Sequence, residues 1–201
     1  MEHGFIPVDP ALPWPRRSLQ SVLYSPKFLY PYLWGLMLPV VVYLIGKAAL
    51  TAHFQQPLSP RQKAWIMTLY SAMLMISLGS PLFLQFVTLP ATATIADHPN
   101  LDTAYAWTLG SLFLAYLTAD TAIGLIEYPS QFGIISGWVH HIGYAVVVVT
   151  QMQMGQIGAY LTMGSAMEVS TVFLALGMIN KAWRHDLIFG ITSVLLFTQI
   201  L

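Results

Sequence analysis

The residues best suited to chemistry in this chain are two adjacent histidines, His140 and His141, inside an otherwise apolar stretch over 132–150. In a membrane helix, ionisable side chains are costly and usually face the bundle interior or a wet cavity. An imidazole can act as a general base or a nucleophile, and a neighbouring carboxylate fixes its tautomer and raises its basicity. The pair therefore marks the place where catalysis would occur.

Two carboxylates and two tyrosines complete the candidate site. Asp120 and Glu168 also lie in apolar stretches, and we expect Asp120 to orient an imidazole and Glu168 to bind or position a substrate. Tyr116 lies one helical turn before Asp120, and Tyr144 lies one turn after His140, so each pair shares a helix face and the tyrosines could help to bind substrate. Adjacent histidines do not readily chelate a metal from a helix, because the zinc pattern spaces them four apart. We therefore expect no metal and no bound cofactor.

A purely structural interpretation of the same residues remains open. Hydrogen bonds between membrane helices contribute about 0.6 kcal/mol on average and would explain a lone histidine. Because successive helical residues point about 100° apart, we expect one of His140 and His141 to face a cavity and the other a neighbouring helix. Two histidines and two carboxylates at similar depth favour a functional site over helix packing alone.

The composition is that of a membrane protein. Hydrophobic residues make up 56% of the 201 residues and charged residues 8%, with a mean hydropathy of +0.65. Soluble domains carry about a quarter charged residues, so these few charges do not cover a water-facing surface. The net charge of +0 disfavours a nucleic-acid partner. The chain has no cysteine, which excludes disulfides and thiol catalysis.

Six apolar segments are long enough to be membrane spans, which need about 20 residues each. They are 30–52, 64–89, 104–126, 132–151, 156–178 and 186–201. Pro39 and Pro81 lie inside the first two spans and should bend them. Residues 1–29 contain five prolines and no apolar core, which favours an extended Pro-rich arm over a cleavable signal peptide. We expect this arm to precede one polytopic domain over 30–201.

The polar residues fall at similar depths in the expected spans. At 1.5 Å per residue, Asp120, His140 and Glu168 lie roughly 9, 12 and 15 Å from the same membrane face. The third and fourth spans are joined by a short loop and should be antiparallel neighbours, so Asp120 can meet the histidines. That face carries most of the basic loop residues: Arg61, Lys63, Lys181 and Arg184. The positive-inside rule therefore favours the cytosol on that side, although the basic arm favours the opposite orientation.

Three segments resemble, in order, the motifs of TLC-domain proteins, the family of the ceramide synthases. Residues 115–120, Ala-Tyr-Leu-Thr-Ala-Asp, are similar to the family's Gly-Tyr-x-x-x-Asp segment. Residues 138–144 are similar to its His-His segment, and residues 166–173 to its Glu-x-Ser-x-x-Phe segment. The resemblance covers about 60–201 and is to the divergent, smaller members, since 142–150 contains none of the aspartates that follow the histidines in ceramide synthases.

The resemblance implies a barrel of six transmembrane helices around a central, lipid-accessible cavity, in the endoplasmic reticulum. It also implies acyl transfer from acyl-CoA, as co-substrate, to a membrane amine or alcohol, with His140 or His141 as the base or transient acyl carrier. Membrane lipids would then be its partners. The sequence leaves open two other functions: a non-catalytic protein that binds or senses lipids and regulates membrane composition, and a transporter. It also leaves open whether the chain forms a homo-oligomer.

Overall fold

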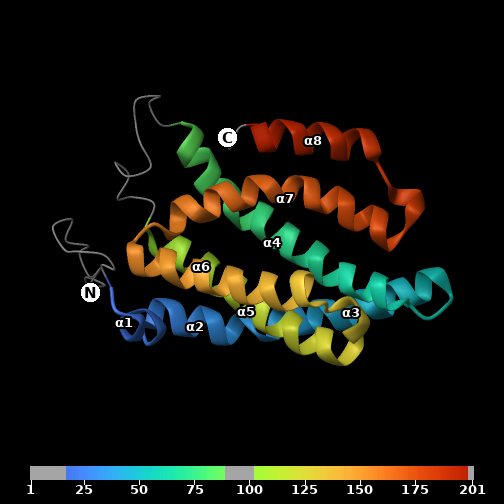
Figure 1. Cartoon of the computed structure of the whole chain (residues 1–201), viewed down its shortest axis with the longest axis horizontal. Coiled ribbons are helices and arrows are strands. Elements are labelled where there is room, and N and C mark those ends of the chain that lie inside the picture. The colour runs from blue at the N-terminus through green and yellow to red at the C-terminus, as the bar shows by residue number, and fades with distance from the viewer. Residues whose placement is uncertain (1–16, 89–101, 199–201) are drawn as a thin grey trace.

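The computed structural model describes residues 17–88 and 102–198, and within these ranges the chain is helical, with no strand. The helices are α1 (Leu19–Leu23), α2 (Pro26–Gly35), α3 (Met37–Phe54), α4 (Pro60–Val87), α5 (Ala104–Glu127), α6 (His140–Met154), α7 (Ile157–Ile179) and α8 (Asp186–Thr198), as Figure 1 shows. Short 3₁₀ turns occupy Pro129–Gln131 and Lys181–Trp183, and a π-helical turn, Ile134–Val139, leads directly into α6.

Four helices are long and apolar enough to cross a membrane. They are Pro26–Phe54, Pro60–Gln85, Ala104–Glu127 and Ile157–Ile179. They correspond to the first, second, third and fifth expected spans, which are confirmed as apolar helices of membrane length. The fourth and sixth expected spans are also helical, but α6 has 15 residues and the described part of α8 has 13. That these two cross the membrane stays a prediction, while the four long helices support an all-α membrane protein.

Proline affects the two expected bends differently. Pro39 has no N–H to donate to the carbonyl of Gly35, and the helix is interrupted at Leu36, between α2 and α3. Pro81 lies inside α4, which nevertheless continues to Val87. The first bend therefore divides a span into two helices, and the second leaves the helix continuous.

The N-terminal segment is less extended than expected. The side chain of Ser18 accepts a hydrogen bond from the N–H of Ser21, and α1 begins at Leu19. A second helix, α2, begins at Pro26, where proline is well suited to the first helical turn. The expected extended arm is therefore wrong over much of 19–29, and its residues 1–16 lie outside the described residues.

The third long helix, α5, lies at the centre of the bundle. Of the most apolar 18-residue stretch of this helix, 61% is buried, against 17%, 39% and 33% for the corresponding stretches of the other three candidate spans. It contacts α2, α3, α4, α6 and α7. Another close pair is α4 with α7, where a Cβ added to Gly79 would lie 2.4 Å from that of Ser165. Small residues thus allow these two helices to approach closely.

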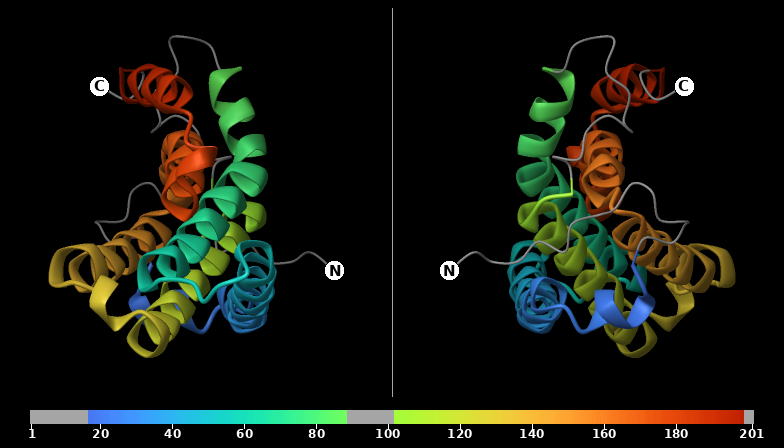
Figure 2. Two further views of the ribbon diagram at one scale, coloured as in Figure 1. Left: turned by 90° about the vertical axis from the view of Figure 1, so that its right-hand side faces the viewer. Right: turned by 90° about the vertical axis from the view of Figure 1, so that its left-hand side faces the viewer.

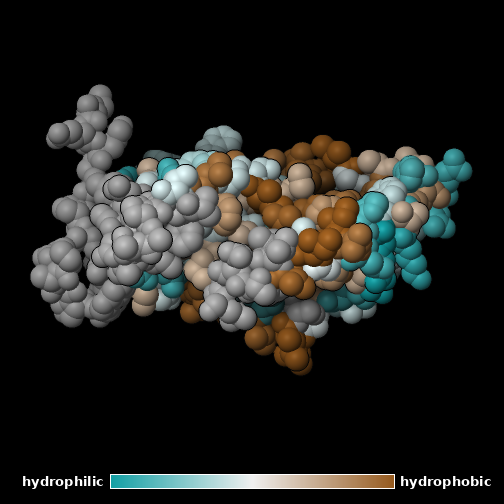
Figure 3. Space-filling model, turned by 90° about the horizontal axis from the view of Figure 1, so that it is seen from above, coloured by the Kyte–Doolittle hydropathy of each residue, from teal (hydrophilic) through white to brown (hydrophobic). Residues whose placement is uncertain are grey.

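The last helix, α8, packs against α7 and lies far from α2 and α3 (Figure 2). Among the described helices, α2, α3, α4, α6 and α7 pack around α5 while α8 packs outside them on α7, and the six-helix barrel expected from the sequence is not confirmed. Figure 3 shows that the end of the molecule holding the α3–α4 and α7–α8 connections is hydrophilic. Exposed residues at this end include Arg61, Lys181, Arg184 and Asp186.

A buried ion pair lies at the opposite end of the molecule, near the beginning of α5 and the end of α6. The guanidinium of Arg17 lies 2.5 Å from the Asp102 carboxylate and donates a second hydrogen bond, of 2.9 Å, to the carbonyl oxygen of Met152. Asp102 also accepts a 2.8 Å hydrogen bond from the indole N–H of Trp107. The start of the described chain is thereby joined both to the beginning of α5 and to the end of α6.

Candidate functional site

His141 and Asp120 form the centre of the candidate site. The Nε2 of His141 lies 3.0 Å from the Oδ2 of Asp120, and its Nδ1 lies 2.9 Å from the carbonyl oxygen of Gly137. Both side chains are buried. Because a carbonyl oxygen can only accept a hydrogen bond, Nδ1 carries a proton and donates the hydrogen bond to Gly137. Nε2 and the carboxyl group then share one further proton, as imidazolium with carboxylate or as imidazole with carboxylic acid.

Two tyrosine hydroxyls also donate to the Asp120 carboxyl group, one to each oxygen. The Tyr128 hydroxyl donates to Oδ1, and the Tyr116 hydroxyl donates to Oδ2 over 3.4 Å. Burial, and then the neighbouring Asp120, raise the pKa of Tyr128 well above its usual value, so its hydroxyl stays protonated and remains a donor. The carboxyl group is thus fixed in the orientation that meets His141.

The π-helical turn before α6 supplies the carbonyl group that His141 binds. Within this turn the N–H of Trp138 bonds to the carbonyl of Gly133, five residues back. The N–H of His140 likewise reaches the carbonyl of Ile135. Each such wide turn adds a residue and rotates the side chains that follow, and π turns occur frequently at functional sites.

Phe132 packs against the face of the His141 ring. The two rings are parallel within 8°, with centroids 5.1 Å apart. Phe132 fits there because Gly124 and Gly137 lack side chains: a Cβ on either would approach the Phe132 ring to 2.7 Å. This arrangement was not predicted from the sequence, although the glycines before and within the turn were its visible signal.

His140 has different surroundings from its neighbour. Its ring contacts the rings of Tyr144 and His141, with centroids 4.6 and 5.5 Å away. Within the described chain no hydrogen bond reaches either ring nitrogen of His140, and the side chain is exposed. One imidazole is therefore bound on both sides, while the other keeps a lone pair for a ligand.

All six predicted site residues line one cavity of about 300 Å³ between α4, α5, α6 and α7. They are Tyr116, Asp120, His140, His141, Tyr144 and Glu168. One histidine was expected to face the cavity and the other a neighbouring helix: His141 does contact Asp120 of α5, but both histidines line the cavity. Glu168 lies on the α7 wall of the cavity. The lining residues include no lysine or arginine. The roles of the six residues stay predictions.

The volume of the cavity limits what it can hold. Ligand pockets span about 300–1,000 Å³, so this cavity lies at the lower end of that range. Aromatic rings of Phe113 and Tyr160 add to its wall, together with hydroxyl groups of Thr68, Ser71 and Ser170. The cavity is therefore suited to a small polar group, such as a lipid headgroup, with aromatic surface beside it.

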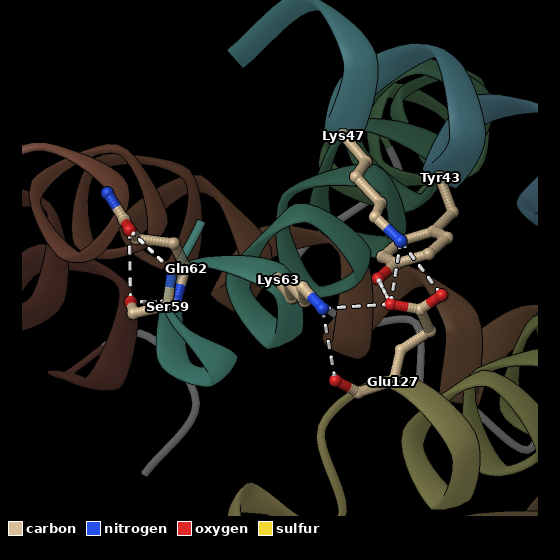
Figure 4. Close-up of polar contacts among 6 residues, drawn as sticks. All are labelled: Tyr43, Lys47, Ser59, Gln62, Lys63 and Glu127. Carbon is tan, nitrogen blue, oxygen red and sulfur yellow. Dashed lines mark hydrogen bonds and ion pairs between the residues drawn. The ribbon is translucent and has the colours of Figure 1, made fainter. Parts of the chain in front are cut away.

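A second polar cluster, which the sequence analysis missed, lies at the end of α5 (Figure 4). The ammonium group of Lys47 lies 2.8 Å from both carboxylate oxygens of Glu127, and that of Lys63 lies 2.9 Å from one of them. The Tyr43 hydroxyl donates to the same carboxylate over 3.2 Å. The available signal was spacing, because Glu127 lies two turns after Asp120 on the same face of α5.

Comparison with protein-family models, with curated proteins and with solved structures finds no match to this chain. Among the described residues, no group of three or more His, Asp or Glu side chains is arranged to hold a metal ion. The resemblance to TLC-domain proteins therefore stays a prediction.

Proposed function

We propose that the protein is a membrane enzyme of lipid metabolism that transfers an acyl group from acyl-CoA to a membrane amine or alcohol. The observation that carries the proposal is the convergence of two histidines and two carboxylates, from α5, α6 and α7, on one cavity. Ionisable groups are expensive in an apolar bundle. Residues that only joined helices would be expected at separate helix interfaces rather than around a shared cavity.

His140 is the residue that we assign to proton transfer. Both nitrogens of His141 are engaged, whereas His140 can accept a proton from the hydroxyl or amine of the acceptor. The acceptor oxygen or nitrogen attacks the thioester carbonyl, its C–O or C–N bond forms, and the C–S bond breaks. The CoA thiolate leaves and takes up the proton from His140, so an ester or amide and free CoA result.

The remaining residues position this reaction. The His141–Asp120 contact joins α6 to α5 and thereby fixes His140, its neighbour in the chain. Glu168, from α7, would accept a hydrogen bond from the acceptor's headgroup, with Tyr116 and Tyr144 beside it. The proposal includes six membrane spans, with α6 and α8 as the additional two, and residence in the endoplasmic reticulum. Acyl-CoA would arrive from the side that carries the basic loops.

A non-catalytic lipid-binding protein is the second candidate. The observation that favours it is the complete hydrogen bonding of His141, since such a residue can have a structural role. In that case the cavity would hold a headgroup without converting it. A transporter is less favoured, because the ionisable residues of the cavity lie in one half of the expected bilayer thickness rather than along a full path.

Lipidomics of cells with and without the protein tests the proposal. We expect His140→Gln to fold like the wild type and to lower formation of the acylated lipid by at least about 100-fold, the scale of general-base catalysis. His185→Gln, an exposed histidine outside the cavity, is the matched control and should leave the lipids unchanged. If the acyl-lipid classes are unchanged in cells without the protein and lipid co-purifies with it, the lipid-binding alternative replaces the enzyme.

A further inference from the structure

We infer that the ligand enters this cavity sideways from the bilayer, between α6 and α7, with its headgroup inside and its acyl chain left in the membrane. The inference rests on the proposed function only in taking the cavity to be a lipid site. In Figures 1 and 2, α6 and α7 meet at their short connection and separate away from it. Gly155 makes that sharp connection, with a φ of 73°.

Side-chain hydrogen bonds join three of the four neighbouring helix pairs around the cavity. Gln62 of α4 donates to the carbonyl of Ile179 at the end of α7 over 2.9 Å. Lys63 of α4 is bound to Glu127 of α5. The third pair, α5 with α6, is joined by Asp120 and His141, as described above. Within the described residues, α6 and α7 share no side-chain hydrogen bond, so this seam is the weakest wall of the cavity.

The seam is also open on its α6 side. His140 and Tyr144 line the cavity yet remain exposed, Tyr144 by 39%. Between them lies Gly143, where an added Cβ would meet nothing within 4 Å. On the other helix, Gly164 of α7 lines the cavity, where an added Cβ would make an ordinary contact of 3.6 Å with Met75 of α4. The open space beside Gly143 therefore lies next to two residues that line the cavity, and it leaves room for a ligand on the α6 side.

The polarity along this path fits an amphiphile. The cavity holds the carboxyl groups and imidazoles, whereas the exposed side chains outside the seam are apolar, including Ile142, Val146 and Val147. A lipid tail that stays in the bilayer exposes no new apolar surface to water, so sideways access avoids that cost. A cavity of about 300 Å³ then needs to hold only the headgroup.

The absence of cysteine from the chain allows a direct test by labelling. Ser71 of α4 is buried and lines the cavity, so Ser71→Cys places a single thiol inside it. In liposomes, we expect N-ethylmaleimide, which enters the bilayer, to label this thiol. With each reagent's rate divided by its rate on a free thiol in solution, a charged methanethiosulfonate reagent, which stays in water, should label it at least about tenfold more slowly, the scale on which one pocket contact discriminates between ligands.

Blocking the seam supplies the decisive comparison. Gly143→Trp, added to Ser71→Cys, should slow labelling by N-ethylmaleimide at least about tenfold by filling the opening. Gly190→Trp in α8 is the matched control, because a Cβ there likewise meets nothing within 4 Å, and it should leave labelling unchanged. Equal labelling by both reagents, or no effect of Gly143→Trp, would overturn the inference. Labelling needs no turnover, so it tests the entry route separately from the enzyme activity. Slower labelling of the Gly143→Trp variant would support the entry route even if the lipid measurements contradict the enzyme, and unchanged labelling would contradict the route even if the enzyme is active.

Discussion

Asp120 and Glu127 lie on one face of α5, two turns apart, and the chain surrounds them differently. Glu127, near the helix end, is held by two lysine ammonium groups and a tyrosine hydroxyl. Asp120, in the interior, meets two tyrosine hydroxyls and one imidazole, with no lysine or arginine beside it. The outer carboxylate is thus matched by permanent charges, while the inner one shares a proton with a ring. Only the inner arrangement can change its charge distribution without breaking a contact.

The largest effect should come from Asp120→Ala. This change leaves the Nε2 of His141 without its partner and removes the acceptor of the Tyr116 and Tyr128 hydroxyls. Breaking a buried pair typically costs about 3–5 kcal/mol, and unfolding of the purified protein in detergent would measure it. Asp120→Asn, which keeps an acceptor of nearly the same shape, should cost less. Equal stability of wild type and Asp120→Ala would show that the inner cluster contributes nothing to the fold.

An intermediate effect is expected for Tyr128→Phe. Its hydroxyl is a buried donor to Asp120, and loss of such a bond costs about 1–3 kcal/mol.

The pH dependence of Tyr128→Phe sharpens the same comparison. Because the folded pKa of Tyr128 lies above the unfolded value of about 10, its stabilising contribution is complete below that pH and declines above it. Melting temperatures measured from pH 8 to 11 should therefore fall more steeply for the wild type than for Tyr128→Phe. Parallel curves would mean that Tyr128 does not titrate differently in the folded state.

The smallest effect is expected for Glu127→Gln. The side chains of Glu127, Lys47 and Lys63 are 22–34% exposed, and partly exposed ion pairs contribute about 0–1 kcal/mol. Unfolding at low and high salt should show a loss that shrinks as salt rises, since screening weakens such pairs. A cost as large as that of Asp120→Ala would remove the distinction between the two carboxylates.

The sequence predicted the lengths of the long helices and the depths of the polar residues along them. Apolar length predicted the four long helices, because a bilayer requires about 20 apolar residues whatever their neighbours are. The rise of 1.5 Å per residue placed Asp120, His140 and Glu168 at similar depth, and the structure brings them to one cavity. Both inferences depend only on distances along a helix axis, which composition and spacing contain.

The sequence did not predict which neighbouring helix each side chain faces. The π-helical turn before His140 rotates the residues after it, so an ideal helix does not predict which histidine meets Asp120. Lys47 and Lys63 reach Glu127 from two other helices, a contact that depends on how the helices are ordered around α5. The place of Phe132 between two glycines likewise requires the relative position of α5 and the π turn.

The Arg17 contact has a consequence for the order of biosynthesis. The residue emerges from the ribosome early, yet one of its two acceptors, the carbonyl of Met152, lies 135 residues later. Asp102 can engage the guanidinium as soon as α5 begins, but the second bond must wait until α6 has been synthesised and docked. The completed arrangement therefore reports that α6 has docked beside the beginning of α5, and a chain arrested before α6 would leave one of these two hydrogen bonds of Arg17 unmade.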